Sequence, residues 1–180
     1  MTAWSRRFTG VLSTLALAGI VAPGPMASAD YAVRCSAVQE LTLSPGLSLQ
    51  GSSGTFENTS GRMECTGPIN GRTPTGPGSY ADSGRYGTRD PDTCQDGGEG
   101  AGVFSAVIPT ADGNMMLTAS YTFTYGDVTT NPGYVSGKFS GDRVRGTFRV
   151  RPVEGDCITK PITRAHEDLD FYFSQSFPTR

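Results

Sequence analysis

Apolar and polar residues alternate along much of the chain, which is the pattern expected of β-strands that bury one face. The longest alternation runs from Met115 to Tyr125, where every second residue is apolar or aromatic and the residues between are mostly serine and threonine. A second runs from Arg143 to Arg151, where valine, glycine and phenylalanine alternate with arginine and threonine. Helix-period runs are absent from the sequence, so the pattern predicts an all-β protein.

Several other segments show shorter alternation. We expect strands at 36–43, 47–50, 54–57, 62–66, 78–86, 102–108, 134–139 and 169–173. Turn sequences such as Ser44-Pro45-Gly46, Asn70-Gly71 and Ser140-Gly141-Asp142 separate them. Short strands with such regular turns favour an antiparallel sheet linked by hairpins.

A glycine recurs two residues before an aromatic residue, as in Gly54 and Phe56 or Gly146 and Phe148. The other such pairs are Gly78/Tyr80, Gly84/Tyr86, Gly102/Phe104 and Gly137/Phe139. A glycine costs strand stability, but it lets a sheet bend and leaves room for a ring from a neighbouring strand. We therefore predict an antiparallel up-and-down barrel of roughly eight to ten strands, with a β-sandwich as the alternative.

The N-terminus has the features of a secretory signal peptide over residues 1–29. Arg6 and Arg7 precede an apolar run, and Ala27-Ser28-Ala29 provides the small residues of a cleavage site. A membrane-spanning helix needs about 20 nearly continuous apolar residues, and here polar residues and prolines interrupt the run. We expect a secreted protein, extracellular or associated with the cell envelope, with no transmembrane segment in the mature chain. Residues 30–180 then suit one domain.

Four cysteines remain in the mature chain: Cys35, Cys65, Cys94 and Cys157. An even number in an oxidising compartment predicts two disulfides, for which three pairings are possible. From their positions in the chain we favour Cys35–Cys157 with Cys65–Cys94. The second bond would tether a long, partly ordered loop at about 67–102, which is rich in glycine, proline and aspartate and includes one or two short strands. The spacing of the cysteines does not fit a zinc site.

The charge balance argues against a nucleic-acid partner. The chain has 15 basic and 17 acidic residues, and removal of Arg6 and Arg7 with the leader leaves 13 basic residues and a net charge of −4. A nucleic-acid binder presents a basic surface instead.

One strand could carry a binding site for a carboxylate or phosphate, because four arginines share one of its faces. These are Arg143, Arg145, Arg149 and Arg151. The alternative is a solvent-exposed face whose arginines pair with Asp168 and Asp170 on a neighbouring strand. The sequence alone does not decide which side of this strand faces inward.

Other candidate sites are weaker. Asp90, Asp92, Asp96 and Glu99 could offer oxygen ligands to calcium, but their spacing fails the EF-hand pattern and an acidic surface loop is the simpler interpretation. His166 and Asp168 could belong to a hydrolytic triad, yet the chain has no G-x-S-x-G sequence around a serine. We therefore assign no catalytic residue, no metal site and no cofactor.

Certain motifs resemble those of small secreted actinobacterial all-β proteins with four cysteines. They are Leu43-Ser44-Pro45-Gly46-Leu47, the Gly-Thr-Phe units, Gly155-Asp156-Cys157-Ile158-Thr159 and Pro161-Ile162-Thr163. The resemblance covers most of the mature chain. It implies secretion and a compact β domain, and it supplies no catalytic residue.

The sequence favours a non-enzymatic binding module that holds a small or amphipathic ligand inside or at the mouth of a barrel. The aromatic residues expected to line that site are Tyr121, Phe123, Phe139 and Phe148. The alternative is a structural or interaction protein of the cell envelope with a packed core. A hydrolase is the weakest of the three hypotheses.

Overall fold

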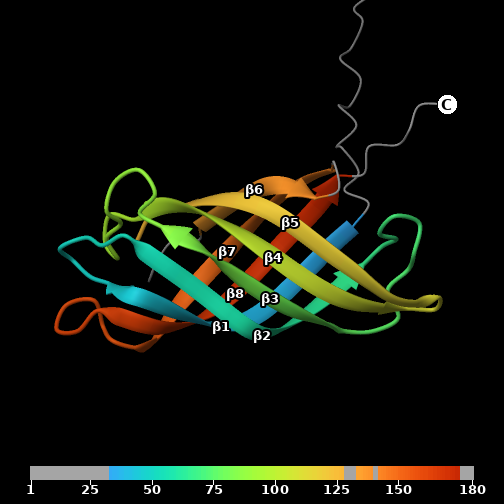
Figure 1. Cartoon of the computed structure of the whole chain (residues 1–180), viewed down its shortest axis with the longest axis horizontal. Coiled ribbons are helices and arrows are strands. Elements are labelled where there is room, and N and C mark those ends of the chain that lie inside the picture. Colours follow the sequence, from blue (N-terminus) through green and yellow to red (C-terminus); the bar gives the residue numbers. More distant parts are fainter. Residues whose placement is uncertain (1–32, 128–132, 140–141, 175–180) are drawn as a thin grey trace, which may run out of the picture.

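The computed structural model describes residues 33–127, 133–139 and 142–174 (Figure 1). The expected signal peptide, residues 1–29, lies outside these ranges. Within them the chain forms eight strands: β1 (Val33–Leu47), β2 (Gly54–Thr66), β3 (Gly78–Tyr86), β4 (Gly98–Thr110), β5 (Gly113–Tyr125), β6 (Gly133–Phe139), β7 (Asp142–Glu154) and β8 (Ile162–Ser174).

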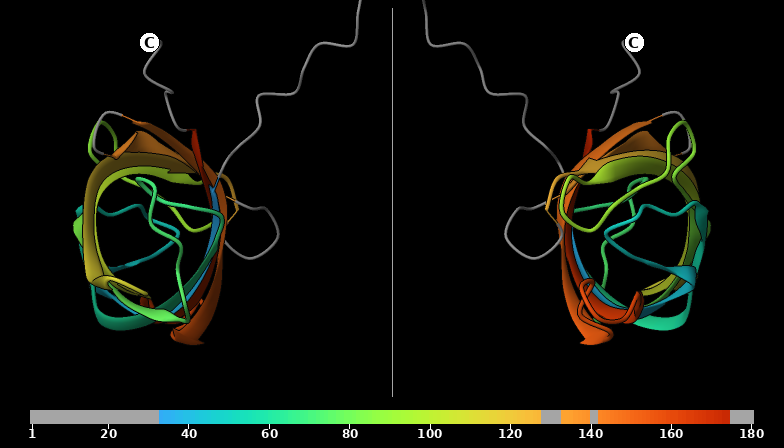
Figure 2. Two further views of the ribbon diagram at one scale, coloured as in Figure 1. Left: turned by 90° about the vertical axis from the view of Figure 1, so that its right-hand side faces the viewer. Right: turned by 90° about the vertical axis from the view of Figure 1, so that its left-hand side faces the viewer.

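The strands form a closed antiparallel barrel in which each strand pairs with its neighbours in sequence. β1 also pairs with β8, from Val33 opposite Phe173 to Leu47 opposite Ile162, and this pairing closes the ring (Figure 2). The predicted up-and-down barrel is confirmed, and the sandwich alternative is wrong. A closed barrel has no unpaired edge strand, because every strand bonds on both sides.

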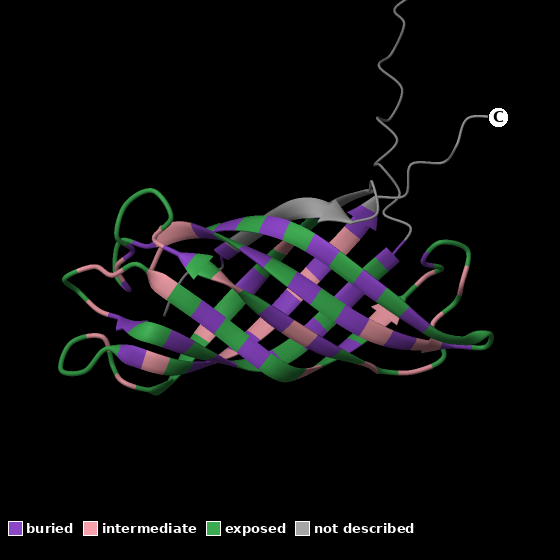
Figure 3. Cartoon of the chain, viewed as in Figure 1, coloured by how far each residue is buried: buried purple, intermediate pink, exposed green. Residues whose placement is uncertain are grey.

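Burial alternates along the strands as the sequence pattern predicted, and Figure 3 shows buried and exposed residues in successive bands. In β5 the side chains of Met115, Leu117, Ala119, Tyr121 and Phe123 are buried while the residues between them are exposed. The buried residues form one hydrophobic core inside the barrel. No helix long and apolar enough to cross a bilayer occurs in the described part of the chain.

Five of the six glycines in the Gly-x-aromatic pairs lie opposite an aromatic residue on an adjacent strand, whereas Gly78 lies opposite Met63. Gly54 of β2 is opposite Tyr86 of β3, and Phe56 is opposite Gly84, so two Gly-x-aromatic pairs interlock. A Cβ atom on Gly54 would lie 2.7 Å from Tyr86 Oη, and one on Gly84 would overlap the ring of Phe56. Each ring therefore fills the space that a side chain on the facing glycine would need, as the sequence predicted.

The strands are longer than the sequence indicated. Segments 54–57 and 62–66 are parts of β2, and an irregularity in its pairing with β3 separates them at Asn58 and Gly61. The region 67–102 contains β3 and the beginning of β4, in keeping with the one or two strands expected within it. The loops 67–77 and 87–97 that remain lie at opposite ends of the barrel.

The two disulfides are present, but the expected pairing is wrong. Cys35 pairs with Cys65, and Cys94 pairs with Cys157. The β1–β2 register places Cys35 directly opposite Cys65, with their Cα atoms 4.1 Å apart. Position along the chain misled the prediction, because hairpin register decides which cysteines meet.

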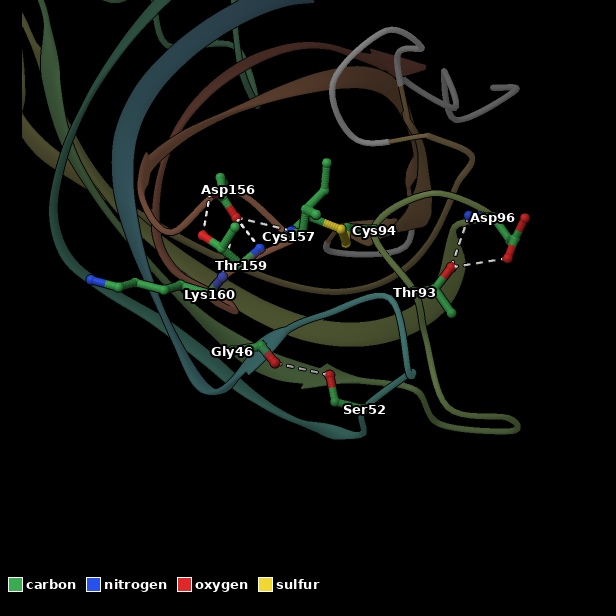
Figure 4. The surroundings of a disulfide bond; sticks show 10 residues. Gly46, Ser52, Thr93, Cys94, Asp96, Asp156, Cys157, Thr159 and Lys160 are labelled. Carbon is green, nitrogen blue, oxygen red and sulfur yellow. Dashed lines mark hydrogen bonds between the residues drawn. A yellow bond between two sulfur atoms is a disulfide. The ribbon is translucent and has the colours of Figure 1, made fainter.

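Three loops gather at one end of the barrel, which we call the covered end (left in Figure 1): residues 48–53, 87–97 and 155–161. Ser52 and Asp92 exchange two backbone hydrogen bonds of 2.8 Å, which join the first loop to the second. The Cys94–Cys157 disulfide joins the second loop to the third (Figure 4). The covered end is thus held together by backbone pairing and a covalent bond.

Candidate functional site

A cavity of about 60 Å³ lies inside the barrel toward the covered end. Six of its lining residues are aromatic: Phe56, Tyr86, Tyr121, Phe123, Tyr125 and Phe148. Leu41, Leu43 and Leu47 of β1 add an aliphatic wall, together with Val150 of β7 and Leu169 of β8. Glu167 of β8 is the one ionisable carboxyl group in a lining that is otherwise apolar or phenolic.

The aromatic wall is a connected set of ring contacts centred on Phe123. This ring meets Phe56 and Phe148 edge to face, with centroids 5.6 Å and 5.9 Å apart, and it stacks on Tyr125 at 6.2 Å. Such arrangements are favourable beyond the area that they bury. The rings therefore hold one another in place, and the wall of the cavity is preformed.

A network of buried polar side chains lies at the inner side of the cavity. Gln39 of β1 is its centre, because its Nε2 donates to Glu167 Oε2 and, at 3.3 Å, to Asp82 Oδ2. Its Oε1 accepts a 2.6 Å hydrogen bond from Asn58 Nδ2. One amide thus connects two carboxyl groups from β3 and β8.

Asp82 accepts further hydrogen bonds from two tyrosines. Tyr121 Oη lies 2.7 Å from both of its carboxyl oxygens, and Tyr80 Oη donates to Oδ2 at 3.1 Å. Burial raises the pKa of Asp82, while these hydrogen bonds act in the opposite direction. Burial and the neighbouring Asp82 carboxylate also raise the pKa of both tyrosines, which therefore remain neutral donors.

Glu167 is in a different electrostatic position. Its side chain is 6% exposed, and within the described residues Gln39 is the side chain that donates a hydrogen bond to it. Burial first, and the Asp82 charge second, raise the pKa of Glu167 to about 8. At neutral pH Glu167 is therefore mostly a neutral acid, whereas the neighbouring Asp82 carboxyl group accepts hydrogen bonds from three side chains.

A third buried carboxyl group is part of the cover. Asp92 is 1% exposed, and it accepts hydrogen bonds from Tyr125 Oη at 3.0 Å and from the backbone N of Glu99 at 3.1 Å. Tyr125 also lines the cavity, so this contact connects the cavity wall to loop 87–97. The sequence placed Asp92 in an acidic surface loop, and for this residue that interpretation is wrong.

The structure brings together three of the four aromatic residues predicted for the site. Tyr121, Phe123 and Phe148 all line the cavity. The side chain of Phe139, the fourth, lies outside the described part of the structure, although its backbone closes the β6 pairing with β7.

The arginine face points away from the cavity. Arg145, Arg149 and Arg151 are exposed on the outside of β7, and the side chain of Arg143 lies outside the described part of the structure. Arg151 pairs with Asp168 of β8 at 2.6 Å, as the solvent-exposed alternative predicted. Asp170 instead pairs with Arg34 of β1 at 3.2 Å. These arginines therefore take no part in the interior site.

The histidine and aspartate considered for a hydrolytic triad lie on the outside of the barrel. His166 Nε2 lies 3.4 Å from Asp168 Oδ1 in a pair on the outside of the barrel. Among the described residues, no group of histidine, cysteine, aspartate and glutamate side chains is arranged to hold a metal ion.

The analysis of the sequence missed Gln39, Asp82 and Glu167. Gln39 lies between buried Ala37 and Leu41, and Glu167 lies between buried Ala165 and Leu169. Asp82 follows buried Tyr80 on the same face of β3. These residues could have been identified as polar side chains at the apolar positions of a strand. A buried polar side chain needs a hydrogen-bond partner, so such positions indicate a polar network.

Comparisons of the chain with protein-family models, with curated proteins and with solved structures gave no match in any of the three.

Proposed function

We propose that this protein is a secreted, non-enzymatic binding module that takes up a small ligand, or the end of an amphipathic one, in the cavity of its barrel. The observation that carries the proposal is the preformed aromatic cavity with a buried carboxyl group at its inner side. Binding sites for small molecules are typically apolar hollows with few, well-placed polar groups.

The size of the cavity limits what can enter. A volume of about 60 Å³ corresponds to roughly four water-sized groups. A short alkyl or similar end group fits this space, and the remainder of a longer ligand would extend toward the covered end. Loops 48–53, 87–97 and 155–161 would then control access.

Secretion is the second part of the proposal, and two features support it. Residues 1–29 have the composition of a signal peptide. All four cysteines of the mature chain are in disulfides, which persist in oxidising compartments.

The test is native mass spectrometry of the protein purified from its secreting host, compared with the same sample denatured without reduction. A mass excess in the native spectrum alone would reveal a non-covalent ligand. Leu41→Phe, which fills the cavity, should remove the excess, since Leu41 is one of its lining residues. Leu117→Phe is the matched control, because Leu117 is buried but is not a lining residue.

Retention of the excess in a folded Leu41→Phe variant would place the ligand elsewhere and overturn the proposal. A host-purified protein without any excess, which also takes up none of a set of added small alcohols and amines, would favour the envelope alternative instead.

A further inference from the structure

We propose that the ligand of this cavity carries a compact organic cation, such as an alkylammonium group, which the carboxylate of Glu167 neutralises while the aromatic wall surrounds its carbon substituents. This inference rests on the proposed function and names the class of ligand.

The first argument is the kind of ionisable side chain that the interior contains. Asp82, Asp92 and Glu167 are each less than 7% exposed, whereas no lysine, arginine or histidine is buried among the described residues. The ion pairs formed by the arginines of the described chain are on its outside, as for Arg34 with Asp170 and Arg164 with Glu40. Buried charges normally have partners of opposite sign. A cation from outside would supply the partner that the barrel lacks.

The second argument identifies Glu167 as the group that meets this cation. Asp82 accepts hydrogen bonds from Gln39, Tyr80 and Tyr121, so its lone pairs are largely occupied. Glu167 accepts one from Gln39 and is itself a lining residue of the cavity. The carboxyl group with unused acceptor capacity is therefore the one that an entering ligand can reach.

The third argument is the aromatic wall of the cavity. Phe123 packs against both Phe56 and Phe148 in the cavity lining, and Tyr86 and Tyr125 extend this aromatic wall toward the cover. The faces of aromatic rings attract ammonium groups, and cages of such rings recognise alkylated ammonium ligands. A neutral apolar ligand would use the wall but would add no partner for the carboxyl group beyond Gln39.

Cation binding must release a proton from Glu167. In the empty barrel the carboxyl group holds its proton at neutral pH, because its pKa is about 8. When an ammonium ion enters, the O–H bond of Glu167 breaks, the proton goes to solvent, and the carboxylate pairs with the cation. The charged and titratable groups around Glu167 are Asp82, Tyr80 and Tyr121 inside and Asp168 outside. Because the tyrosines stay neutral, the released proton comes from the Glu167 carboxyl group and not from a phenol.

The test compares butylammonium with 1-butanol, which have similar size and differ in charge. Affinity is measured by NMR titration of the isotope-labelled mature protein, and proton release by calorimetry in two buffers of different ionisation heat. We expect butylammonium to bind at least about tenfold more tightly than 1-butanol at about pH 8, because only the ammonium gains a charge-assisted hydrogen bond. Its affinity should rise about tenfold between about pH 6 and pH 7 and level off near pH 9, with one proton released per ligand below about pH 7.

Glu167→Gln keeps the shape and removes the ionisable group. In this variant the preference for butylammonium and the release of a proton should both disappear, while 1-butanol binds as before. Glu40→Gln is the matched control, since Glu40 is on the outside of β1 and pairs with Arg164 at 2.6 Å. Both ligands should bind this control as they bind the unchanged protein.

Two results would overturn the inference in distinguishable ways. Equal binding of the two probes in the cavity without proton release would exclude the cation and leave the binding module standing. If neither probe shifts the resonances of Phe123 and Phe148, and the host-purified protein carries no ligand, both the inference and the proposed function fail.

Discussion

Gly100 shows how a single hydrogen atom in place of a side chain determines the packing of this barrel. It lies opposite Phe123, the central ring of the cavity wall. A Cβ atom on Gly100 would overlap this ring and the carbonyl oxygen of Arg85. The glycine is required here by close packing, because it does not have a positive φ.

We expect Gly100→Ala to lower the free energy of unfolding by roughly 1 to 3 kcal/mol, the usual cost of overpacking. Gly76→Ala is the control, since the nearest atom to its Cβ would be Pro109 Cγ at 4.0 Å. Urea unfolding of the two variants measures the difference. Equal stability of the two variants would show that the Phe123 ring moves aside without cost.

Glu167 makes the stability of the barrel depend on pH. Its pKa is about 8 in the folded protein and about 4.3 in an unfolded chain. The folded state therefore binds more protons than the unfolded state between these values, and stability must fall as pH rises through this window. Asp82 also lowers the stability of the folded state as the pH rises, because its pKa is raised as well.

We expect the unfolding free energy to drop by roughly a few kcal/mol between about pH 5 and pH 8. In Glu167→Gln the drop should be much smaller, while Glu40→Gln should behave as the unchanged protein does. Urea unfolding midpoints of the three proteins, measured across this pH range, test the expectation. A pH dependence of the same size in Glu167→Gln would mean that other groups cause it.

The residues of the site divide into those that the sequence could identify and those that it could not. Tyr121, Phe123 and Phe148 were found because alternation places them on the apolar face of their strands, and Phe148 also belongs to a Gly-x-aromatic pair. Gln39 and Glu167 were missed because their role depends on strands that are far apart in sequence and meet only where β1 pairs with β8. Asn58 of β2 is buried in the same network, where it donates a hydrogen bond to Gln39.

The two disulfides connect different kinds of elements. Cys35–Cys65 joins β1 and β2, which are already hydrogen-bonded neighbours. Cys94–Cys157 joins loops 87–97 and 155–161, which no strand pairing connects. Local alternation predicted the strands well, but it contains no information on which loops meet above the cavity, and this is why the pairing could not be derived.

We expect replacement of either cysteine pair by alanine to lower stability by roughly 4 kcal/mol in the chain-entropy treatment. Hydrogen exchange should then separate the two variants. Without Cys94–Cys157, loops 87–97 and 155–161 should exchange faster and a cavity ligand should leave more quickly. Without Cys35–Cys65, the covered end should keep its protection. Equal loop protection in both variants would show that the backbone pairing of Ser52 with Asp92 is sufficient to hold the cover.

The pairing of β1 with β8 closes the whole barrel, so the stability of the first strands depends on the last one. β8 contributes Glu167 and Leu169 to the cavity and Phe171 and Phe173 to the core, and it bonds to β7 as well as to β1. Its loss would expose two strand edges and one side of the core together. A barrel of this kind is therefore expected to unfold as one cooperative unit.

We expect a chain ending at residue 161, which lacks β8, to be unfolded or aggregated when refolded from denaturant. A chain ending at Ser174, which keeps the whole of β8, should fold with the stability of the longer protein. Circular dichroism and size-exclusion chromatography of the two truncations provide the comparison. A monomeric, cooperatively unfolding product from the shorter chain would contradict this expectation, because seven strands would then suffice to close or cover the core. Loss of Glu167 with β8 also means that such a product should lack the part of the pH dependence that Glu167 contributes in the complete barrel.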